Sequence, residues 1–414
     1  MMRNTKATPS MGEDTRPRVI FDSHHPKDYL AIRKLGQRCL DQGMQVLWTI
    51  HDKDVLVPLI RENGYEPLVL TRAQKGLVRK LSELIVYDWK LAALARRVRP
   101  LALVGKTVTL AHVGWLLGIP TLLINDDSAA ANPQYRYLAM PFATRIVTSE
   151  CLGEDYGSRQ RTYPGLMELA YLHPDDFVPD PNVRAELGMS AEERLFLIRL
   201  AAFDAYHDVG GRGLSRDLLG RVLKRLDPHG RTFIVSEAPL AGDLLRYELP
   251  LAASRLHHLI AAADLVLGDG LTVCVEAALL GVPAIAIGSY IGKHRYADTI
   301  EKRFGLMYGF KPEQETAFLA CLDELLVRPG VREEWARRRA VMLGEWNDPT
   351  DIYWEELTGL IAPAPGSTAA RVRNPAAPPR RISQPSSPTA SGRAATVRME
   401  TADCRAVRRN SNRQ

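Results

Sequence analysis

One segment of the chain combines a glycine turn, a helix start and a single acid at a spacing that suits a nucleotide. A buried strand is expected at 265–268, followed by a tight turn at Asp269 and Gly270 and a helix at 271–280. The first amides of a helix lack partners within the helix and lie at its positive end, so they can hold a phosphate or diphosphate. Glu276 falls about a turn and a half into this helix. Its carboxylate could accept two hydrogen bonds from a sugar diol such as ribose.

The segment ends in Gly281 and Pro283, which stop the helix, and a second apolar strand is expected at 284–287. Gly270 lets a ligand approach the backbone closely because it has no side chain. An ordinary strand–turn–helix–strand of an α/β domain, with an incidental glutamate, is the alternative interpretation. The residues expected to contact a nucleotide-linked substrate are Arg199, Gly268, Asp269, Gly270, Leu271, Thr272 and Glu276.

A second group of polar residues follows the strand expected at 195–199. Arg199 ends that strand, and His207 and Arg212 follow it in a glycine-rich stretch. Guanidinium and imidazole groups placed there could meet phosphate oxygens. We therefore count His207 among the candidate catalytic residues, with a solvated polar loop as the alternative.

Histidines also follow the first expected strand, at 18–22. His24 and His25 lie in the loop before the next helix, at the carboxyl end of the strand. A histidine titrates near neutral pH and can act as a general base. We expect His24 to be that base rather than His25. Alternatively, the two histidines cap the helix or face water.

Two adjacent acids, Asp126 and Asp127, follow the strand expected at 120–125. Either could serve as a base or bind an acceptor, and they could equally cap a helix expected at 132–140. No set of His, Cys and carboxylate residues has the spacing of a metal site. Neither a Walker A sequence nor Gly-x-Gly-x-x-Gly follows the first strand. We therefore expect no cofactor and no metal.

The elements around these motifs alternate between strand and helix in two series, which predicts parallel, doubly wound sheets. The first series has strands at 18–22, 44–50, 66–70, 101–105, 120–125 and 145–148, with helices at 27–42, 55–63, 77–97 and 110–117. The second has strands at 195–199, 232–235, 265–268 and 284–287, with helices at 214–226, 256–262, 271–280, 294–304, 313–326, 331–346 and 352–360.

Five segments follow from this pattern. We expect two Rossmann-like domains, an N-terminal one at 17–165 for the acceptor and a C-terminal one at 166–348 for the donor. A C-terminal helix is expected at 349–361. A flexible N-terminus at 1–16 and a tail at 362–414, rich in Pro, Ser, Ala and Arg, are expected to be disordered because they cannot bury enough apolar area.

The charge, cysteine content and hydropathy of the chain indicate its partners and its location in the cell. The 414 residues carry a formal net charge of +6. From 364 to 414 the chain has ten arginines against two acids, so the rest is nearly neutral and no specific nucleic-acid partner is expected.

Five scattered cysteines predict a reducing, cytoplasmic setting. No apolar run reaches the roughly 18 residues of a membrane span. A basic amphipathic stretch at 72–85 is compatible with peripheral contact with an anionic membrane, or with a solvated helix face.

The glycine–acid segment resembles the donor-nucleotide motif of GT-B glycosyltransferases and of non-hydrolysing UDP-N-acetylglucosamine 2-epimerases. Gly270, Glu276 and the Gly281–Pro283 stop keep the spacing of that motif, although Leu271 replaces a small residue. The wider chain, from Arg18 to Phe310, resembles the family grouped as domain of unknown function 354. The segments that carry this second resemblance are 204–210, 235–237, 256–258 and 163–172, the last of which includes Glu168 and Tyr171.

These resemblances imply two Rossmann-like domains facing a cleft and a UDP-sugar, in particular a UDP-N-acetylhexosamine, as substrate. The expected function is sugar transfer to a glycan or lipid-linked acceptor in envelope or exopolysaccharide assembly. A 2-epimerase or UDP-releasing hydrolase is the second expectation, and a non-catalytic nucleotide-sugar-binding protein the third. Epimerisation is disfavoured because Lys106 stands where the epimerases have an acid after the fourth strand.

Overall fold

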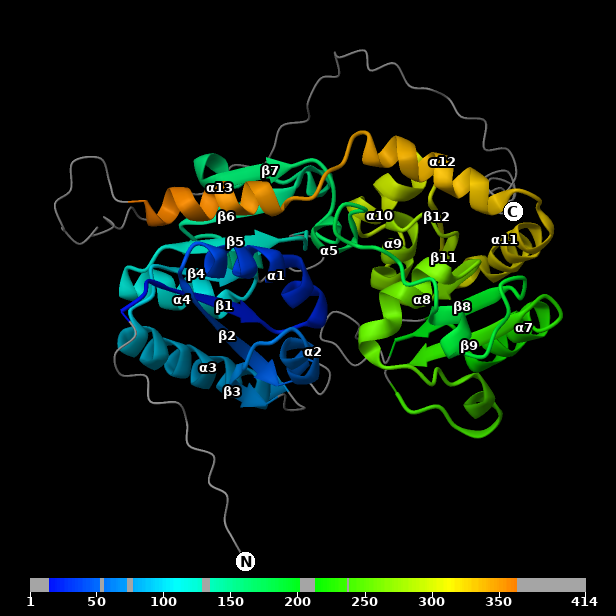
Figure 1. Ribbon diagram of the computed structural model, residues 1–414, viewed down its shortest axis with the longest axis horizontal. Coiled ribbons are helices and arrows are strands. Elements are labelled where there is room, and N and C mark those ends of the chain that lie inside the picture. Colours follow the sequence, from blue (N-terminus) through cyan, green and yellow to red (C-terminus); the bar gives the residue numbers. More distant parts are fainter. Residues whose placement is uncertain are drawn as a thin grey trace, which may run out of the picture. The chain divides into compact units, whose positions relative to one another are not determined.

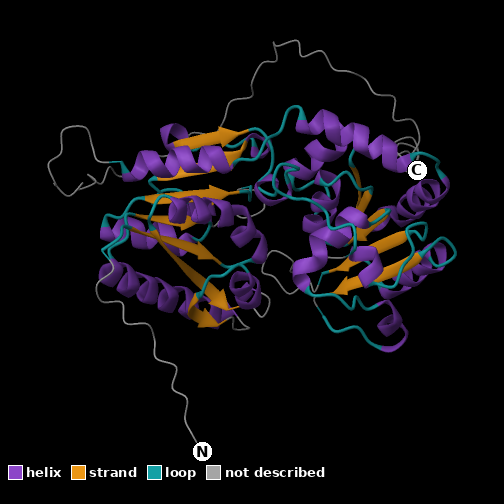
Figure 2. Ribbon diagram, viewed as in Figure 1, coloured by secondary structure: helices purple, strands orange, loops and turns teal. Residues whose placement is uncertain are grey.

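The computed structural model describes residues 15–52, 56–72, 77–128, 135–201, 213–236 and 238–362. It contains two sheets, of seven and five strands, with helices packed around each (Figures 1 and 2). The described residues form two compact units. The first takes 15–124, 142–146 and 350–362, and the second takes the remainder. The chain thus returns to the first unit in its last helix.

The seven-stranded sheet has the order β3-β2-β1-β4-β5-β6-β7. β1 pairs in parallel with β2 and β4, β2 with β3, and β4 with β5. The interior strand β1 is almost entirely buried, as expected for a parallel strand covered on both faces. The strands are β1 Arg18–Ser23, β2 Gln45–Asp52, β3 Leu68–Arg72, β4 Ala102–Gly105, β5 Thr121–Asn125, β6 Arg145–Ser149 and β7 Gln160–Tyr163.

The five-stranded sheet has the order β12-β11-β10-β8-β9, and all of its pairs are parallel. The carboxyl ends of all five strands therefore lie at one edge, where ligands of such sheets bind. The strands are β8 Leu195–Leu200, β9 Arg231–Ser236, β10 Leu265–Gly268, β11 Ala284–Ile287 and β12 Met307–Phe310.

Helices connect the strands of both sheets. In the first unit, α3 packs against α4 and α1 against α13. Arg38 on α1 forms an ion pair with Asp351 on α13, with 2.6 Å between Nη2 and Oδ1. The helices of this unit are α1 Pro26–Asp41, α2 Leu56–Glu62, α3 Leu77–Val98, α4 Val108–Leu117 and α13 Thr350–Ile361.

The helices of the second unit include two short ones before β8 and others around the sheet. The short ones are α5 Leu169–Leu172 and α6 Val183–Glu186. The others are α7 Arg216–Leu226, α8 Leu256–Ala262, α9 Leu271–Leu279, α10 Arg295–Thr299, α11 Glu315–Val327 and α12 Val331–Leu343.

The predicted fold class, two Rossmann-like parallel sheets, is confirmed. Two strands were not predicted, β7 and β12. In the stretch expected to form a helix at 132–140, the structure has a π-helix at Tyr135–Ala139, and 129–134 lie outside the described residues. The expected tail and flexible N-terminus also lie almost wholly outside them.

Two helices of the first unit expose large apolar side chains. Ile85 and Trp89 on α3 are 64% and 69% exposed, and Trp115 and Leu116 on α4 are 56% and 62% exposed. Among the described residues, no helix is both long and apolar enough to cross a membrane.

Candidate functional site

Among the described residues, no side chain caps the start of α9, which follows the turn after β10. Gly270 is the N-cap residue of α9. Its φ of −123° is open to any residue, and among the described residues a Cβ would meet only the Cβ of Ala201, at 3.9 Å. Neither the backbone nor this packing requires glycine, and the first amides of a helix have no partner within the helix itself.

Asp269, which precedes this turn, bonds to the backbone of its own unit. It is 2% exposed. One carboxylate oxygen accepts the N–H of Ala201 at 2.7 Å, and the other accepts the N–H of Leu214 at 3.4 Å. Burial raises the pKa of this carboxyl to about 6, although these backbone donors and the charge of Arg199 act to lower the pKa. Asp269 therefore bonds through both carboxylate oxygens to the backbone on either side of 202–212.

The raised pKa of Asp269 predicts a pH-dependent stability. Between about pH 4 and pH 6 the folded protein binds a proton at this residue that the unfolded chain has lost. The free energy of unfolding should therefore fall as pH rises through this window, by up to about 3 kcal/mol. Urea denaturation of wild type and Asp269→Asn at pH 4.5, 5.5 and 7 measures this contribution. A difference between the two proteins that stays constant across the series would contradict it.

Glu276 lies in the second turn of α9 and is 4% exposed. Its Oε1 accepts the hydroxyl of Tyr171 on α5 at 2.7 Å and lies 3.2 Å from Nε2 of His257 on α8. Burial, followed by the charges of Glu276 and of Glu168, holds the pKa of Tyr171 well above its ordinary value. The phenol therefore remains a hydrogen-bond donor, and it fixes the carboxylate at one orientation. A carboxylate has about four acceptor sites, more than the one that the Tyr171 hydroxyl uses at Glu276.

Asp126 belongs to the same buried surroundings. Its charge also contributes to the raised pKa of Tyr171. Asp126 and Glu168 line a cavity of about 10 Å³, which is at the lower limit for one water molecule. Asp127 is half-buried and lies in a turn where Asn125 accepts its N–H at 3.2 Å. Asp126 is therefore coupled electrostatically to the tyrosine that contacts the predicted ribose-binding residue.

Arg199 lies at the edge of the five-stranded sheet where β8 and β9 end. It is paired in register with Gly268 of β10, so it lies beside the turn after that strand. Its Nη1 donates to the carbonyl oxygens of Leu200 at 3.1 Å and Val235 at 3.3 Å. These bonds orient the guanidinium at the edge where a diphosphate is expected. His207 lies outside the described residues, so its role stays a prediction.

A second group of polar side chains lies at the carboxyl end of β1, in the first unit. Asp22 is fully buried. It accepts hydroxyl hydrogen bonds from Thr49 at 2.6 Å, from Thr107 at 2.6 Å and from Tyr87. Nε2 of His24 lies 3.4 Å from Oδ2 of Asp22. A histidine beside a buried carboxylate is a candidate general base.

Gly105 allows the end of β4 to lie close to Asp22 on β1. A Cβ at this position would lie 2.4 Å from the carbonyl oxygen of Asp22, far inside contact distance. Only glycine therefore lets the end of β4 reach β1, where Thr107 then meets the Asp22 carboxylate.

His25, the neighbour of His24, is the N-cap of α1, and its Nδ1 accepts the N–H of Lys27 at 3.2 Å. His25 therefore has a capping role, and the choice of His24 as the base stays a prediction. His51, at the end of β2, was missed in the sequence. Its ring centroid lies 5.4 Å from that of His24, and its Nε2 lies 3.1 Å from Oε1 of Glu83.

No group of three or more His, Cys, Asp or Glu residues within the described ranges is placed to hold a metal ion.

Similar folds occur in solved structures of sugar-transferring and sugar-epimerising enzymes. The glycosyltransferase SsfS6 of Streptomyces sp. SF2575, solved with thymidine diphosphate, is 13% identical with a TM-score of 0.54, over 83% of this chain and 100% of that one. A putative UDP-N-acetylglucosamine 2-epimerase from Listeria monocytogenes is 14% identical with a TM-score of 0.60, over 84% and 97%. The spinosyn rhamnosyltransferase SpnG, also solved with thymidine diphosphate, is 14% identical with a TM-score of 0.56, over 82% and 100%.

The fold is therefore that of GT-B glycosyltransferases and UDP-N-acetylglucosamine 2-epimerases. Within this class, residues 28–315 match the model of a family described as protein of unknown function (DUF354), and the chain belongs to that family. The sequence matches none of the curated proteins.

Proposed function

We propose that the protein is a glycosyltransferase that moves a sugar from a UDP-sugar, in particular a UDP-N-acetylhexosamine, to an acceptor in envelope or exopolysaccharide assembly. The turn after β10 carries this proposal. There, the uncapped start of α9 follows Gly270, and Glu276 lies on the same helix. Two neighbours in fold, SsfS6 and SpnG, were solved with thymidine diphosphate, which supports a nucleoside diphosphate as ligand.

In this proposal the amides of Leu271 and Thr272 and the guanidinium of Arg199 bind the diphosphate. They stabilise the negative charge that develops when the sugar–phosphate bond breaks. Glu276 binds the ribose. These residues supply the positive field themselves, so the reaction is proposed to proceed without a resident metal.

His24 is the proposed base. It takes the proton of the acceptor hydroxyl while that oxygen bonds to the anomeric carbon and UDP departs. Asp22, which is buried and lies 3.4 Å from Nε2, would favour the imidazolium that forms. Asp126 and Asp127 are the alternative candidates for this role, with Asp127 the more accessible of the two.

A thermal-shift panel of UDP, UDP-N-acetylglucosamine, UDP-glucose, thymidine diphosphate, ADP and GDP tests the ligand class. A ligand at about 100 times its Kd stabilises the folded state by about 2.7 kcal/mol, which raises Tm by several degrees. We expect UDP and UDP-N-acetylglucosamine to give the largest shifts. If no nucleotide raises Tm, the proposal is wrong.

Product analysis then separates the reactions. Release of UDP from UDP-N-acetylglucosamine at full rate without an acceptor would indicate the epimerase or hydrolase. Binding without turnover in the presence of candidate acceptors would indicate a non-catalytic binding protein. The cytoplasmic location and the membrane-surface contact remain proposals from the sequence.

A further inference from the structure

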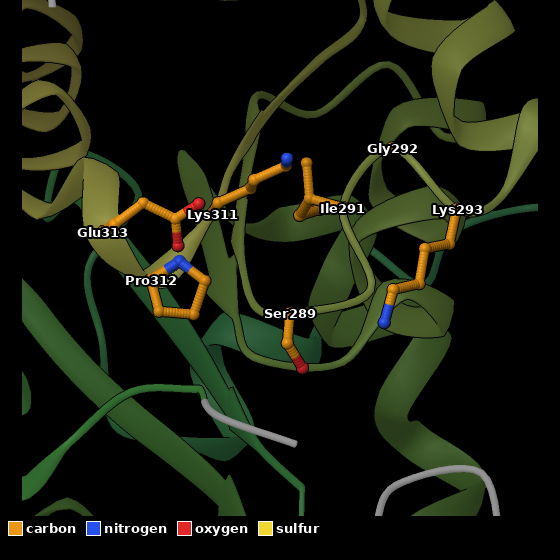
Figure 3. A pocket seen from close by; sticks show the side chains of 7 residues that line it. All are labelled: Ser289, Ile291, Gly292, Lys293, Lys311, Pro312 and Glu313. Atoms are coloured by element: carbon orange, nitrogen blue, oxygen red, sulfur yellow. The ribbon is translucent and has the colours of Figure 1, made fainter. Parts of the chain in front are cut away.

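A pocket of about 510 Å³ opens where the chain leaves two neighbouring strands of the five-stranded sheet, β11 and β12 (Figure 3). Its size is within the range of about 300–1,000 Å³ that is usual for small-molecule sites. None of the nucleotide contacts proposed above lines it. The lining residues are Ser289, Ile291, Gly292, Lys293, Lys311, Pro312 and Glu313.

The first of the two loops has a backbone fixed by its own hydrogen bonds. The N–H of Ile291 donates to the carbonyl of Gly288 at 3.2 Å, and that of Lys293 donates to the carbonyl of Tyr290 at 2.9 Å. Gly292 has a φ of +83°, a left-handed conformation that favours glycine. Ile291 is 5% exposed and forms an apolar wall. Lys293 is therefore presented to the pocket from a defined turn.

The charge of the pocket comes from two lysines on different loops. Lys293 follows β11 and Lys311 follows β12, and Figure 3 shows both side chains at the pocket. Within the part of the chain that the structure describes, neither ammonium group forms an ion pair. Glu313 is the third charged residue of the lining. With two lysines and one glutamate, the lining carries a net positive charge that favours an anion.

The pocket lies at the same edge of the sheet as the start of α9. β11 lies between β10 and β12, and all three strands are parallel. Neighbouring strands are about 4.8 Å apart, so one to two strand spacings separate the turn after β10 from the pocket. A sugar joined to a diphosphate at the α9 turn would be close enough to reach it.

We propose that this pocket binds an anionic substituent, a carboxylate or a phosphate, that is carried by the transferred sugar or by the acceptor. The lysines supply charge-assisted hydrogen bonds to the anion. The idea that the anion is part of a sugar substrate rests on the proposed function. The preference of the pocket for an anion rests on Lys293 and Lys311 alone.

Two matched ligand pairs, measured by calorimetry on the full chain, test the proposal and identify the source of the anion. UDP-glucuronic acid against UDP-glucose differs by a carboxylate on the donor sugar. Glucose 6-phosphate against glucose, without UDP, differs by a phosphate on a free sugar. In at least one pair we expect the anionic member to bind about tenfold more tightly.

Variants connect this preference to the pocket. The double variant with Lys293→Met and Lys311→Met should reduce the preference to less than about twofold and leave UDP affinity unchanged. Glu313→Gln should strengthen binding of the anionic member by about two- to fivefold, because it removes a like charge. Lys224→Met, at an exposed lysine on α7, is the matched control and should change nothing.

The proposal is overturned if neither pair shows a preference for the anion, or if the preference survives in the double variant. A failure of the proposed function gives a different result. In that case UDP and both UDP-sugars fail to bind, and the pair of glucose 6-phosphate and glucose still decides whether the pocket binds an anion.

Discussion

Replacing His24 by alanine is expected to lower kcat/KM for sugar transfer by about 10²- to 10⁴-fold, the usual contribution of a general base. The expectation rests on the position of His24 beside fully buried Asp22, with 3.4 Å between Nε2 and Oδ2. UDP affinity should be unchanged, because the proposed nucleotide contacts lie on the other unit. Initial rates with a UDP-sugar and an identified acceptor, together with calorimetric titration by UDP, measure both quantities.

The neighbouring histidine provides the matched control. His25 accepts the N–H of Lys27 as the N-cap of α1, so His25→Ala should cost about 1 kcal/mol of stability and leave the rate nearly unchanged. Asp22→Asn should lower the rate with His24 in place, because the amide cannot stabilise the imidazolium. Full activity of His24→Ala would remove His24 from the mechanism and leave Asp126 or Asp127 as the base.

The fold was predictable because its signal is local. Alternating apolar strands and amphipathic helices with glycine or proline between them identify a doubly wound sheet from the sequence alone. The strands that were missed have weak local signals. β7 has two exposed residues in its middle, and β12 has only four residues, one of them glycine.

The candidate site was predictable only where it follows a strand and a turn. Glu276 and Gly270 were identified because their spacing lies within one continuous segment. The group around Asp22 was not, since Thr49, Tyr87 and Thr107 are separated from it by 27, 65 and 85 positions. Parallel pairing of β1 with β2 and β4 brings these residues together, and no local pattern in the sequence indicates their roles.

The direction of side chains was a second feature of the site that could not be predicted from the sequence. The sequence placed Asp269 at the turn, but whether its carboxylate faces a ligand or the backbone depends on where β8 ends relative to β10. In the structure Gly268 pairs with Arg199, so the N–H of Ala201 comes within 2.7 Å of the Asp269 carboxylate. A carboxylate turned toward a diphosphate would also repel it, which favours the observed orientation.

The role of Glu276 can also be tested by experiment. Its carboxylate contacts Tyr171 and His257 within the protein, and it is proposed to bind the ribose. Glu276→Gln keeps the size of the side chain and removes its charge. A hydrogen bond to a charged group contributes about 1.5–3 kcal/mol. We therefore expect the Kd for UDP to rise by about 10- to 100-fold. Calorimetric titration of the purified variant with UDP measures this change.

Tyr171→Phe distinguishes a role in binding from a role in folding. This variant removes the hydroxyl that donates to Glu276 at 2.7 Å but leaves the carboxylate in place. Losing a buried hydrogen-bond partner costs about 1–3 kcal/mol, so urea denaturation should show reduced stability. UDP affinity should change by less than about threefold. If Glu276→Gln retains wild-type UDP affinity, or weakens it no more than Tyr171→Phe does, the carboxylate belongs to the buried core and the ribose is bound elsewhere.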